Sequence, residues 1–242
     1  MLQIDHVSKS YGSVQAVQDL SLSLEPGELF GFLGPNGAGK TTTLNLVSGL
    51  IQPDRGRILI DGIDNQQDPL AAKALLGVIP DTPYVYEKLT GYEFLEFIGH
   101  LYGMEPGDLQ QAIETYREQF SLGDWLYDPL ESYSHGMRQK IVFSGALLHR
   151  PRLLIVDEPM VGLDPISIRT VKRLLQEKCQ EGMTVLMSTH TLQIAEEICS
   201  RVGIINGGRL IATGTMTALR RQARSESTLE DIFLSLVENG AS

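Results

Sequence analysis

The sequence predicts an α/β protein with a phosphate-loop core, an antiparallel β layer and an inserted α-helical subdomain. Three patterns predict this class. A glycine-rich loop at residues 34–41 lies between a segment typical of a strand and one typical of a helix. Helical periodicity prevails between about residues 87 and 150, and a strand–helix–strand pattern follows from residue 153. With 242 residues, of which 42% are hydrophobic, the chain can bury a full core.

The first part of the chain is expected to contain strands. Residues 3–7, 20–24 and 57–61 alternate apolar and polar side chains, which is typical of half-exposed strands, and we expect them to form the antiparallel layer. Residues 29–33 are almost entirely apolar and predict a buried strand that leads into the glycine-rich loop. A helix is expected to begin near Gly39.

The glycine-rich loop predicts phosphate binding. Its glycines let successive N–H groups point inward at an anion, and the positive end of the following helix dipole faces the same place. Lys40 would then reach the β- and γ-phosphates of a nucleotide, and the Thr41 hydroxyl would bind Mg²⁺. The alternative is a glycine-rich turn that binds nothing, but the flanking strand and helix patterns favour the phosphate loop. The residues predicted to bind the nucleotide here are Asn36, Gly37, Ala38, Gly39, Lys40, Thr41 and Thr42.

The rest of the chain predicts an interrupted core. After the helical stretch, residues 153–156 and 184–188 are apolar runs on either side of an amphipathic segment at 167–180. This order suits a right-handed βαβ unit in a buried parallel sheet. We therefore expect one domain, with its core in residues 1–86 and 151–226, a helical subdomain in 87–150 and a helical tail in 227–242.

Three polar residues follow the apolar runs at the edge where open α/β sheets bind ligands. Asp157 is placed to hold Mg²⁺, and Glu158 to polarise a water molecule that attacks the γ-phosphate. His190 would donate a hydrogen bond to that phosphate or orient the water. The alternatives are a solvated strand end for the two acids and a structural role for the histidine, and the phosphate loop in the same chain favours a catalytic role.

Composition narrows the class further. The net charge of -10 opposes a general nucleic-acid-binding surface, so no direct nucleic-acid partner is expected. No apolar run approaches the length of about 18 residues that a transmembrane helix needs, and the chain does not begin with a secretion signal. The two cysteines have no metal-ligand spacing and predict reduced thiols in a soluble, cytoplasmic chain.

Residues 132–140 pass from small polar residues into a helical pattern, which places Ser134 and Gly136 at a helix N-terminus. Free N–H groups there bind anions, and an ordinary helix cap is the alternative. The phosphate loop, this segment, Asp157-Glu158, residues 162–165 and His190, in this order and spacing, resemble the ATP-binding subunit of an ABC transporter. The resemblance covers almost the whole chain. Residues 132–140 resemble the signature motif, which separates this family from other phosphate-loop ATPases and kinases.

This resemblance implies a RecA-like core that hydrolyses ATP with Mg²⁺. It also implies a head-to-tail dimer with a second ATPase subunit, expected to be a second copy, in which ATP lies between the phosphate loop of one subunit and the signature of the other. Asp164 would lie in a loop at the dimer interface. Tyr11 would stack on adenine, and Val17 would make a weaker contact with the same base. The alternative for Tyr11 is an ordinary surface tyrosine. The signature residues implied to contact ATP on the partner are Ser134, His135, Gly136 and Met137.

Several positions depart from the family pattern. Tyr133 and His135 replace the usual leucine and first glycine of the signature, and Met137 stands where glutamine is commonest. Asp81 stands where the family normally has a glutamine that contacts Mg²⁺ and the attacking water. A carboxylate can also bind Mg²⁺, so we retain Asp81 as a catalytic and metal-binding candidate whose charge would alter metal affinity or turnover. Val161 replaces a small polar residue.

The resemblance implies that the chain powers a transporter from the inner face of the cell membrane. Its ending at residues 227–234 resembles that of subunits that energise bacterial exporters, which implies export. Its partners would be integral-membrane permease subunits, which would dock near residues 81–100 and recognise the substrate. A terminal helix that merely packs on the core is the alternative for the ending.

Two other functions compete with transport: a soluble ABC ATPase that clamps a ribosome, DNA or a scaffold, and a phosphate-loop kinase. The former would be favoured by tandem halves or a coiled-coil insertion, and the latter by an acceptor pocket.

Overall fold

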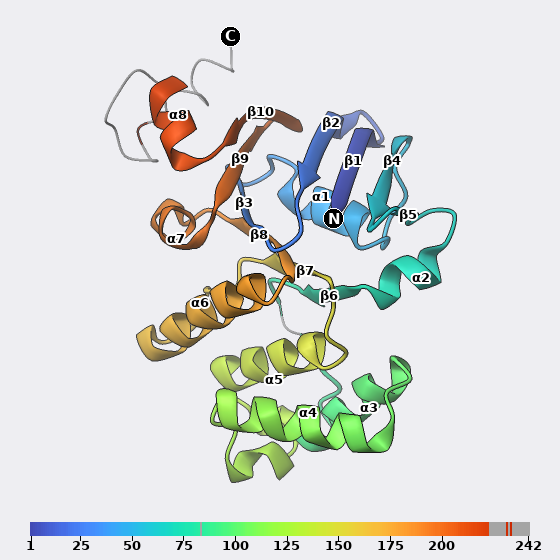
Figure 1. Ribbon diagram of the computed structural model, residues 1–242, viewed down its shortest axis with the longest axis vertical. Coiled ribbons are helices and arrows are strands. Elements are labelled where there is room, and N and C mark those ends of the chain that lie inside the picture. The colour runs from blue at the N-terminus through green and yellow to red at the C-terminus, as the bar shows by residue number, and fades with distance from the viewer. Residues whose placement is uncertain (83, 223–230, 232, 234–242) are drawn as a thin grey trace.

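The computed structural model describes residues 1–82, 84–222, 231 and 233, and it places two β-sheets above a group of helices (Figure 1). The predicted α/β class is confirmed. A four-stranded antiparallel sheet has the order β2-β1-β4-β5 and contains β1 (Leu2–Tyr11), β2 (Val14–Leu24), β4 (Arg55–Ile60) and β5 (Ile63–Asp64). A six-stranded sheet has the order β10-β9-β3-β8-β7-β6 and contains β3 (Leu29–Leu33), β6 (Leu76–Ile79), β7 (Leu153–Asp157), β8 (Thr184–Thr189), β9 (Arg201–Asn206) and β10 (Arg209–Gly214).

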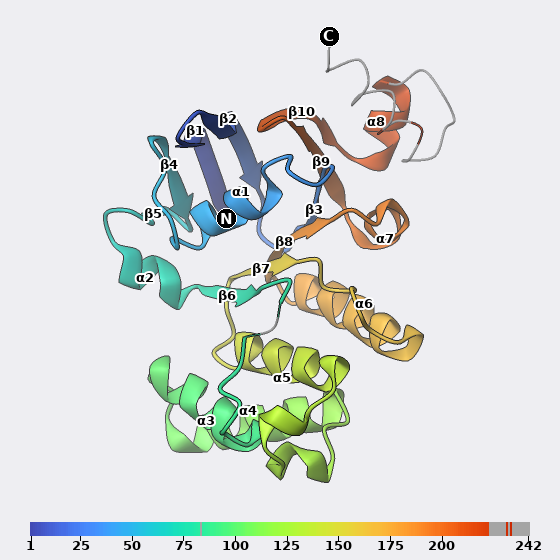
Figure 2. The ribbon, with the colours of Figure 1, turned by 180° about the vertical axis from the view of Figure 1, so that it is seen from behind.

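The helices divide into those that cover the sheets and those that stand apart. The first set consists of α1 (Lys40–Val47), α2 (Pro69–Ala74), α6 (Pro165–Gln180), α7 (Leu192–Ile198) and α8 (Met216–Gln222). The second set consists of α3 (Gly91–Leu101), α4 (Pro106–Gln119) and α5 (His135–Leu147), with the 3-10 turns η1 (Asp124–Tyr127) and η2 (Leu130–Ser132). Figure 2 shows from behind that α3, α4 and α5 lie together below the sheets. None of the helices in the described residues is long and apolar enough to span a bilayer.

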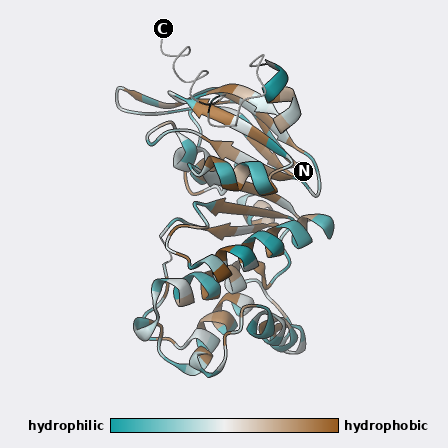
Figure 3. Cartoon of the chain, turned by 90° about the vertical axis from the view of Figure 1, so that its left-hand side faces the viewer, coloured by the Kyte–Doolittle hydropathy of each residue, from teal (hydrophilic) through white to brown (hydrophobic). Residues whose placement is uncertain are grey.

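The central strands are buried on both faces, which explains their continuous apolar runs. Phe30 and Phe32 of β3 pack in one cluster with α1 and the antiparallel sheet. Leu29 and Leu33 of the same strand pack in a second cluster, with α6, α7 and the helices α3, α4 and α5, which we call the helical group. Figure 3 shows by colour that the central strands are hydrophobic, while the helices carry hydrophilic residues on their outer faces. The helix α1 is therefore held between the two sheets, and the loop before it is held with it.

The strand predictions hold in part. The segments at 3–7 and 20–24 lie in β1 and β2 of the antiparallel sheet, and the segment at 57–61 lies in β4 except for Asp61, which follows the end of the strand. The strands β7 and β8 are parallel neighbours joined by α6, as predicted. Sequence reasoning missed β6, β9 and β10. The hairpin between β9 and β10 had a signal, since Asn206-Gly207-Gly208 is typical of a tight turn and both glycines have positive φ. Of the predicted tail at 227–242, only Asp231 and Phe233 are among the described residues, and the exporter-like ending otherwise lies outside them.

Two side chains of the helical group donate hydrogen bonds to one backbone oxygen of the core. His149 Nε2, just after α5, lies 2.8 Å from the carbonyl oxygen of Leu76 in β6, and the Tyr102 hydroxyl, after α3, lies 3.3 Å from it. The two rings stack with their centroids 3.5 Å apart. Because a carbonyl only accepts, Nε2 carries the hydrogen, which leaves Nδ1 as a buried acceptor without a hydrogen-bond partner. These contacts of His149 with Leu76 and Tyr102, which we call the His149 joint, therefore favour the neutral form of the imidazole.

We expect the free energy of unfolding to fall as the pH drops below about 6.5, because the unfolded chain then binds a proton that His149 resists in the folded chain. Burial lowers the pKa of His149, and the facing Tyr102 phenol stays neutral because burial raises its pKa. His149→Phe keeps a ring against Tyr102 and should flatten this dependence in urea unfolding between about pH 5 and pH 8.

A second histidine provides the control. The hydrogen bond and charge of Asp19 raise the pKa of His6, so this exposed residue stabilises the fold at low pH, in the opposite sense to His149. Its replacement, His6→Gln, should make the acid-side loss of stability steeper. Equal pH slopes for the wild-type and His149→Phe proteins would show that the joint does not titrate as described.

Candidate active site

The loop between β3 and α1 curls around the end of a lysine side chain. Gly37 and Gly39 have φ values of 79° and 106°, in the left-handed region that favours glycine. A Cβ atom at Gly39 would lie 2.3 Å from the backbone oxygen of Ala16, so no larger residue fits there. Lys40 Nζ donates to the backbone oxygens of Gly34 and Pro35, at 2.8 Å and 3.2 Å. The lysine is only 8% exposed, and its ammonium group lies where the loop closes.

A cleft of about 580 Å³ opens over this loop. Its lining comes from the turn and start of β2, the loop, the start of α1, the segment after β6, the end of β7 and the β9–β10 turn. The residues are Val14, Gln15, Ala16, Gln18, Asn36, Gly37, Gly39, Lys40, Thr41, Thr42, Asp81, Asp157, Glu158 and Gly207. Most predicted loop residues therefore face one space. Ala38 does not line it: its side chain is buried, and its N–H donates to the Pro35 oxygen at 3.2 Å.

Asp157 lies beside Thr41 at the floor of the cleft. The Thr41 hydroxyl donates to Asp157 Oδ2 at 3.1 Å, and the hydroxyl of Ser188 donates to Oδ1. Ser188 stands directly opposite Asp157 in the parallel pairing of β7 and β8. Sequence reasoning missed this contact, which depends on strand register. The set offers carboxylate and hydroxyl oxygens, the hard ligands that Mg²⁺ prefers, so these residues fit that ion.

Glu158 follows Asp157 and is held by two neighbours from the end of β8. His190 Nδ1 lies 2.8 Å from Glu158 Oε1, and the hydroxyl of Thr189 donates to Oε2 at 3.2 Å. Glu158 has a φ of 49°, a conformation uncommon outside glycine, in which its side chain reaches both the cleft and His190. His190 itself does not line the cleft. The imidazole and the Thr189 hydroxyl thus both hold the Glu158 carboxylate in place, and sequence reasoning missed the contact from Thr189.

Two of the remaining candidates differ in their relation to the cleft. Asp81 lines it and also lines a smaller hollow of about 250 Å³ between α1 and β6. Tyr11 is about half exposed at the end of β1, paired with the cleft residue Val14, and Lys9 Nζ lies 5.8 Å from its ring centroid. It therefore lies next to the cleft without being part of its lining.

The role predicted for Val17 requires a correction. Its side chain is only 1% exposed and packs in the core beneath β2, so the contact with adenine is not available to it. Strand alternation explains the difference, because Ala16 and Gln18, on the opposite face of β2, line the cleft instead.

The signature residues Ser134, His135, Gly136 and Met137 lie outside the lining of this cleft. Ser134 is the N-cap of α5, and its hydroxyl accepts from the N–H of Met137 at 3.3 Å. The preceding Tyr133 is buried, and its hydroxyl donates to the Trp125 oxygen at 2.6 Å, so the residue that replaces leucine anchors the segment. Burial raises the pKa of Tyr133 to about 12.

Asp164 caps α6, the helix that follows β7. Its side chain accepts from the N–H groups of Ile166 and Ser167, at 2.9 Å and 3.0 Å, and from the Ser167 hydroxyl. These bonds lower the pKa of Asp164, those from Ser167 most strongly. These bonds fix the C-terminal end of the loop before α6 to the first turn of that helix.

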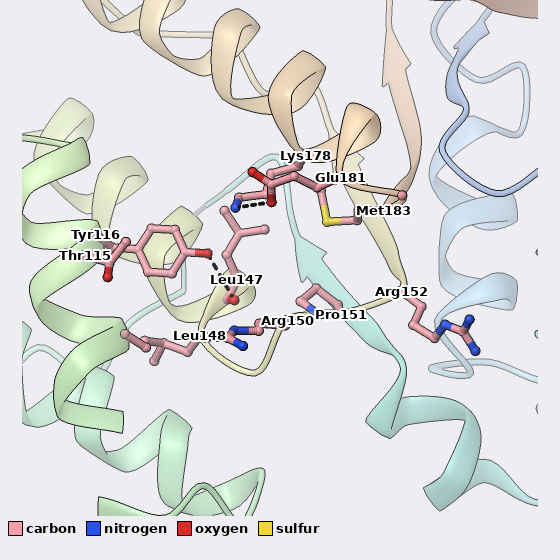
Figure 4. A pocket seen from close by; sticks show the side chains of 12 residues that line it. Thr115, Tyr116, Leu147, Leu148, Arg150, Pro151, Arg152, Lys178, Glu181 and Met183 are labelled. Carbon is pink, nitrogen blue, oxygen red and sulfur yellow. Dashed lines mark hydrogen bonds and ion pairs between the residues drawn. The ribbon is translucent and has the colours of Figure 1, made fainter. Parts of the chain in front are cut away.

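A second cleft, of about 630 Å³, lies between α4, the end of α5 and the end of α6 (Figure 4). Among the described residues that line it, Glu181 is the one acid; it pairs with Lys178 at 2.7 Å, and the Tyr116 hydroxyl donates to the Leu147 oxygen at 3.3 Å. It contains neither the glycine loop nor the acids that end β7. The first cleft, which holds both, is therefore the candidate active site.

Known proteins resemble this chain in sequence and in fold. Residues 17–161 match the family model described as ABC transporter. The linearmycin resistance ATP-binding protein LnrL of Bacillus subtilis (strain 168) is 39% identical over 219 residues, which cover 90% of this chain and 70% of that protein. The lipopolysaccharide export system ATP-binding protein LptB of Haemophilus influenzae is 33% identical over 218 residues, with 89% and 90% of the two chains covered.

A solved structure extends the likeness to nearly the whole chain. The structure described as the ATP binding subunit of an ABC transporter superposes with a TM-score of 0.93 at 32% identity, and covers 98% of this chain and 99% of that one. The glycine loop, Asp157 and Glu158, and residues 134–137 all lie within the 17–161 range that the family model matches. The chain therefore belongs to the ABC transporter family, as one of its ATP-binding ATPase subunits.

Proposed function

We propose that the chain closes with a second copy around ATP and hydrolyses it to drive an exporter through separate permease subunits. The observation that carries this proposal is the separation of two half-sites in one chain. The cleft contains Lys40, Asp157 and Glu158, while the signature residues Ser134 and Gly136 lie outside it. A second chain placed head to tail would bring its signature over the open cleft.

The chemistry of the first half-site follows from its contacts. The phosphates of ATP would lie on the N–H groups of the loop, and Lys40 would exchange the oxygens of Gly34 and Pro35 for phosphate oxygens. Thr41 and Asp157 would hold Mg²⁺, which neutralises phosphate charge when it is bound. Asp81 lines the same space and adds a further carboxylate.

Hydrolysis requires a base beside the γ-phosphate. Glu158 would accept the proton of the attacking water, and its carboxylate is already fixed by Thr189 and His190. The partner subunit would supply the remaining wall, from the N-terminus of its α5 beginning at Ser134, where free N–H groups favour an anion. Asp164 and Tyr11 would complete the interface and the adenine contact. Bound ATP then stabilises the dimer, and hydrolysis of the ATP allows the two subunits to separate.

Phosphate release by the purified chain tests this chemistry against the kinase alternative. With ATP and Mg²⁺ and no added acceptor, a water-directed ATPase should release ADP and phosphate in equal amounts. A requirement for an added small-molecule acceptor would favour phosphotransfer instead.

The coupling to a membrane is supported by a hydrophobic surface near the predicted docking segment. A groove of about 200 Å³ lies between β6 and the helices α3 and α5, and Val78, Phe94, Ile98 and Val142 line it. Tyr84 at its rim is 85% exposed. Exposed apolar grooves of this kind serve protein contacts. We therefore propose that a permease subunit docks here and places the chain at the cytoplasmic face of the membrane.

Export is the direction that the relatives favour. LptB is named for a lipopolysaccharide export system and LnrL for linearmycin resistance. The soluble alternative, an ABC ATPase that clamps nucleic acid, is disfavoured by the net charge of -10. Inside-out vesicles that contain the chain and its partner permease test the direction. An exporter should accumulate the substrate inside these vesicles when ATP is added outside, and ATP-driven movement out of the vesicles would contradict an export role.

Tyr84→Ala should weaken binding to the permease by about tenfold or more, because an exposed tyrosine beside an apolar groove offers a large contact area that binding would bury. The fraction of the chain that sediments with membranes of its host cells measures this binding. ATP hydrolysis by the isolated chain should be unchanged. Tyr127→Ala is the matched control, because Tyr127 is also exposed but lies on η1 outside the groove. Equal membrane binding of the two variants would place the docking surface elsewhere.

A further inference from the structure

A histidine of the signature lies against the loop that follows the catalytic strand of the same chain. His135 Nε2 lies 3.2 Å from the backbone oxygen of Val161. A Cβ atom added to Gly162 would be 2.7 Å from Cδ2 of the same ring, so the imidazole packs directly on this glycine. Gly162 also has a φ of 73°, which favours glycine. Both His135 and Val161 are positions where this chain departs from the family pattern.

The contacted loop continues from the catalytic turn. The N–H of Val161 donates to the backbone oxygen of Glu158 at 3.2 Å, and Glu158 is the residue whose carboxylate faces the cleft. Since the carbonyl of Val161 can only accept, His135 Nε2 carries the hydrogen of the other bond. One peptide segment is thus fixed on one side to the signature and on the other to the turn that bears the base.

We propose that His135 is a positioning residue that couples the two half-sites of one chain. This inference rests on the proposed function, in which the signature acts on ATP of the partner while Glu158 acts on ATP of its own chain. A shift of the signature onto the partner's ATP would move Val161 through His135 and so set the position of Glu158. Each closed half-site then assists the other, which predicts positive cooperativity in ATP hydrolysis.

The first test compares two replacements of His135. His135→Phe keeps a ring of similar size and removes the donor, and it should lower kcat by about fivefold, the rate equivalent of one hydrogen bond. The Hill coefficient for ATP should fall towards one, while ATP binding to the dilute, unpaired chain and the melting temperature stay unchanged. His135→Gln offers an amide donor and should restore kcat to within about twofold. His6→Phe is the matched control, because His6 lies on β1, away from both half-sites, and its ring is hydrogen-bonded to Asp19 on β2.

The second test uses the contact with Gly162. Gly162→Ala places a methyl group against the His135 ring and should lower kcat in the native background. The same change in a His135→Gly background meets no ring, so its effect should shrink to that of backbone strain alone. Such non-additivity measures the coupling between the two residues. Additive effects would contradict it.

The outcomes separate this inference from the proposed function. A His135→Phe protein with wild-type kcat and Hill coefficient would overturn the role of His135, and the shared site would stand if the Glu158→Gln protein still dimerises with ATP. A Glu158→Gln protein that stays monomeric with ATP would overturn the shared site and this coupling together.

Discussion

Glu158→Gln is expected to lower the rate of ATP hydrolysis by about 10²- to 10⁴-fold, because the amide cannot accept the proton of the attacking water. The replacement keeps the size of the side chain, and its amide can still accept from the Thr189 hydroxyl, which lies 3.2 Å from Oε2. Asp157, Thr41 and the loop are untouched, so ATP should bind as before. The closed dimer should then persist, since the step that opens it is blocked.

Two measurements check this result. Phosphate release with ATP and Mg²⁺ gives the rate, and size-exclusion chromatography in the same buffer gives the fraction of dimer. Glu177→Gln, on the outer face of α6 where Glu177 pairs with Arg173, is the matched control and should be fully active. A Glu158→Gln protein that hydrolyses ATP at the wild-type rate and remains monomeric at high concentration would refute the mechanism.

Mixing two inactive variants is expected to restore activity, because each composite site needs a loop from one chain and a signature from the other. Lys40→Met removes the cation that the loop surrounds. Gly136→Asp places a carboxylate where the phosphate of the partner's ATP would lie, and a Cβ atom there meets its nearest neighbour only at 4.0 Å, so the change fits the fold. Each variant alone should show almost no ATPase activity.

The size of the recovery follows from counting sites. In an equal mixture about half of the dimers are mixed, and one of the two sites in each mixed dimer is intact, so independent sites would return about a quarter of wild-type activity. Sites that assist each other should return less than this, because the intact site of a mixed dimer has no active neighbour. Mixing the Gly136→Asp protein with a chain that carries both changes should restore nothing, because no intact site can form. Activity that stays absent in the first mixture would show that one chain carries the whole site.

Much of the site could be predicted from the sequence because its parts are local. The glycines of residues 34–39 and the strand before them indicate the loop by themselves, since backbone conformation depends mainly on adjacent residues. Asp157 and Glu158 follow an apolar run of strand length, so their place at the end of a strand needed no knowledge of the fold. The same holds for Ser134, whose capping role is visible in the pattern that follows it.

Contacts across the sheet could not be predicted in this way. The pairing of Ser188 with Asp157 and of Thr189 with Glu158 depends on the register of β7 and β8. Val17 was misassigned because alternation along β2 places it in the core, and which face of that strand is covered depends on the six-stranded sheet and α1. The short strands β6, β9 and β10 were missed for a related reason, because short apolar runs are ambiguous until neighbouring strands pair with them.

The sequence alone thus determined the local parts of the candidate site: a glycine-rich loop between a strand and a helix, two acids at the end of a buried strand and a helix capped by Ser134. Only the tertiary structure decided how these parts relate, by tying Glu158 to His190 and His135 to Val161 across more than twenty intervening residues in each case. The physical reason is range. Turns, caps and strand ends are set by neighbours along the chain, whereas strand order and register are set by the packing of both faces of the sheet at once.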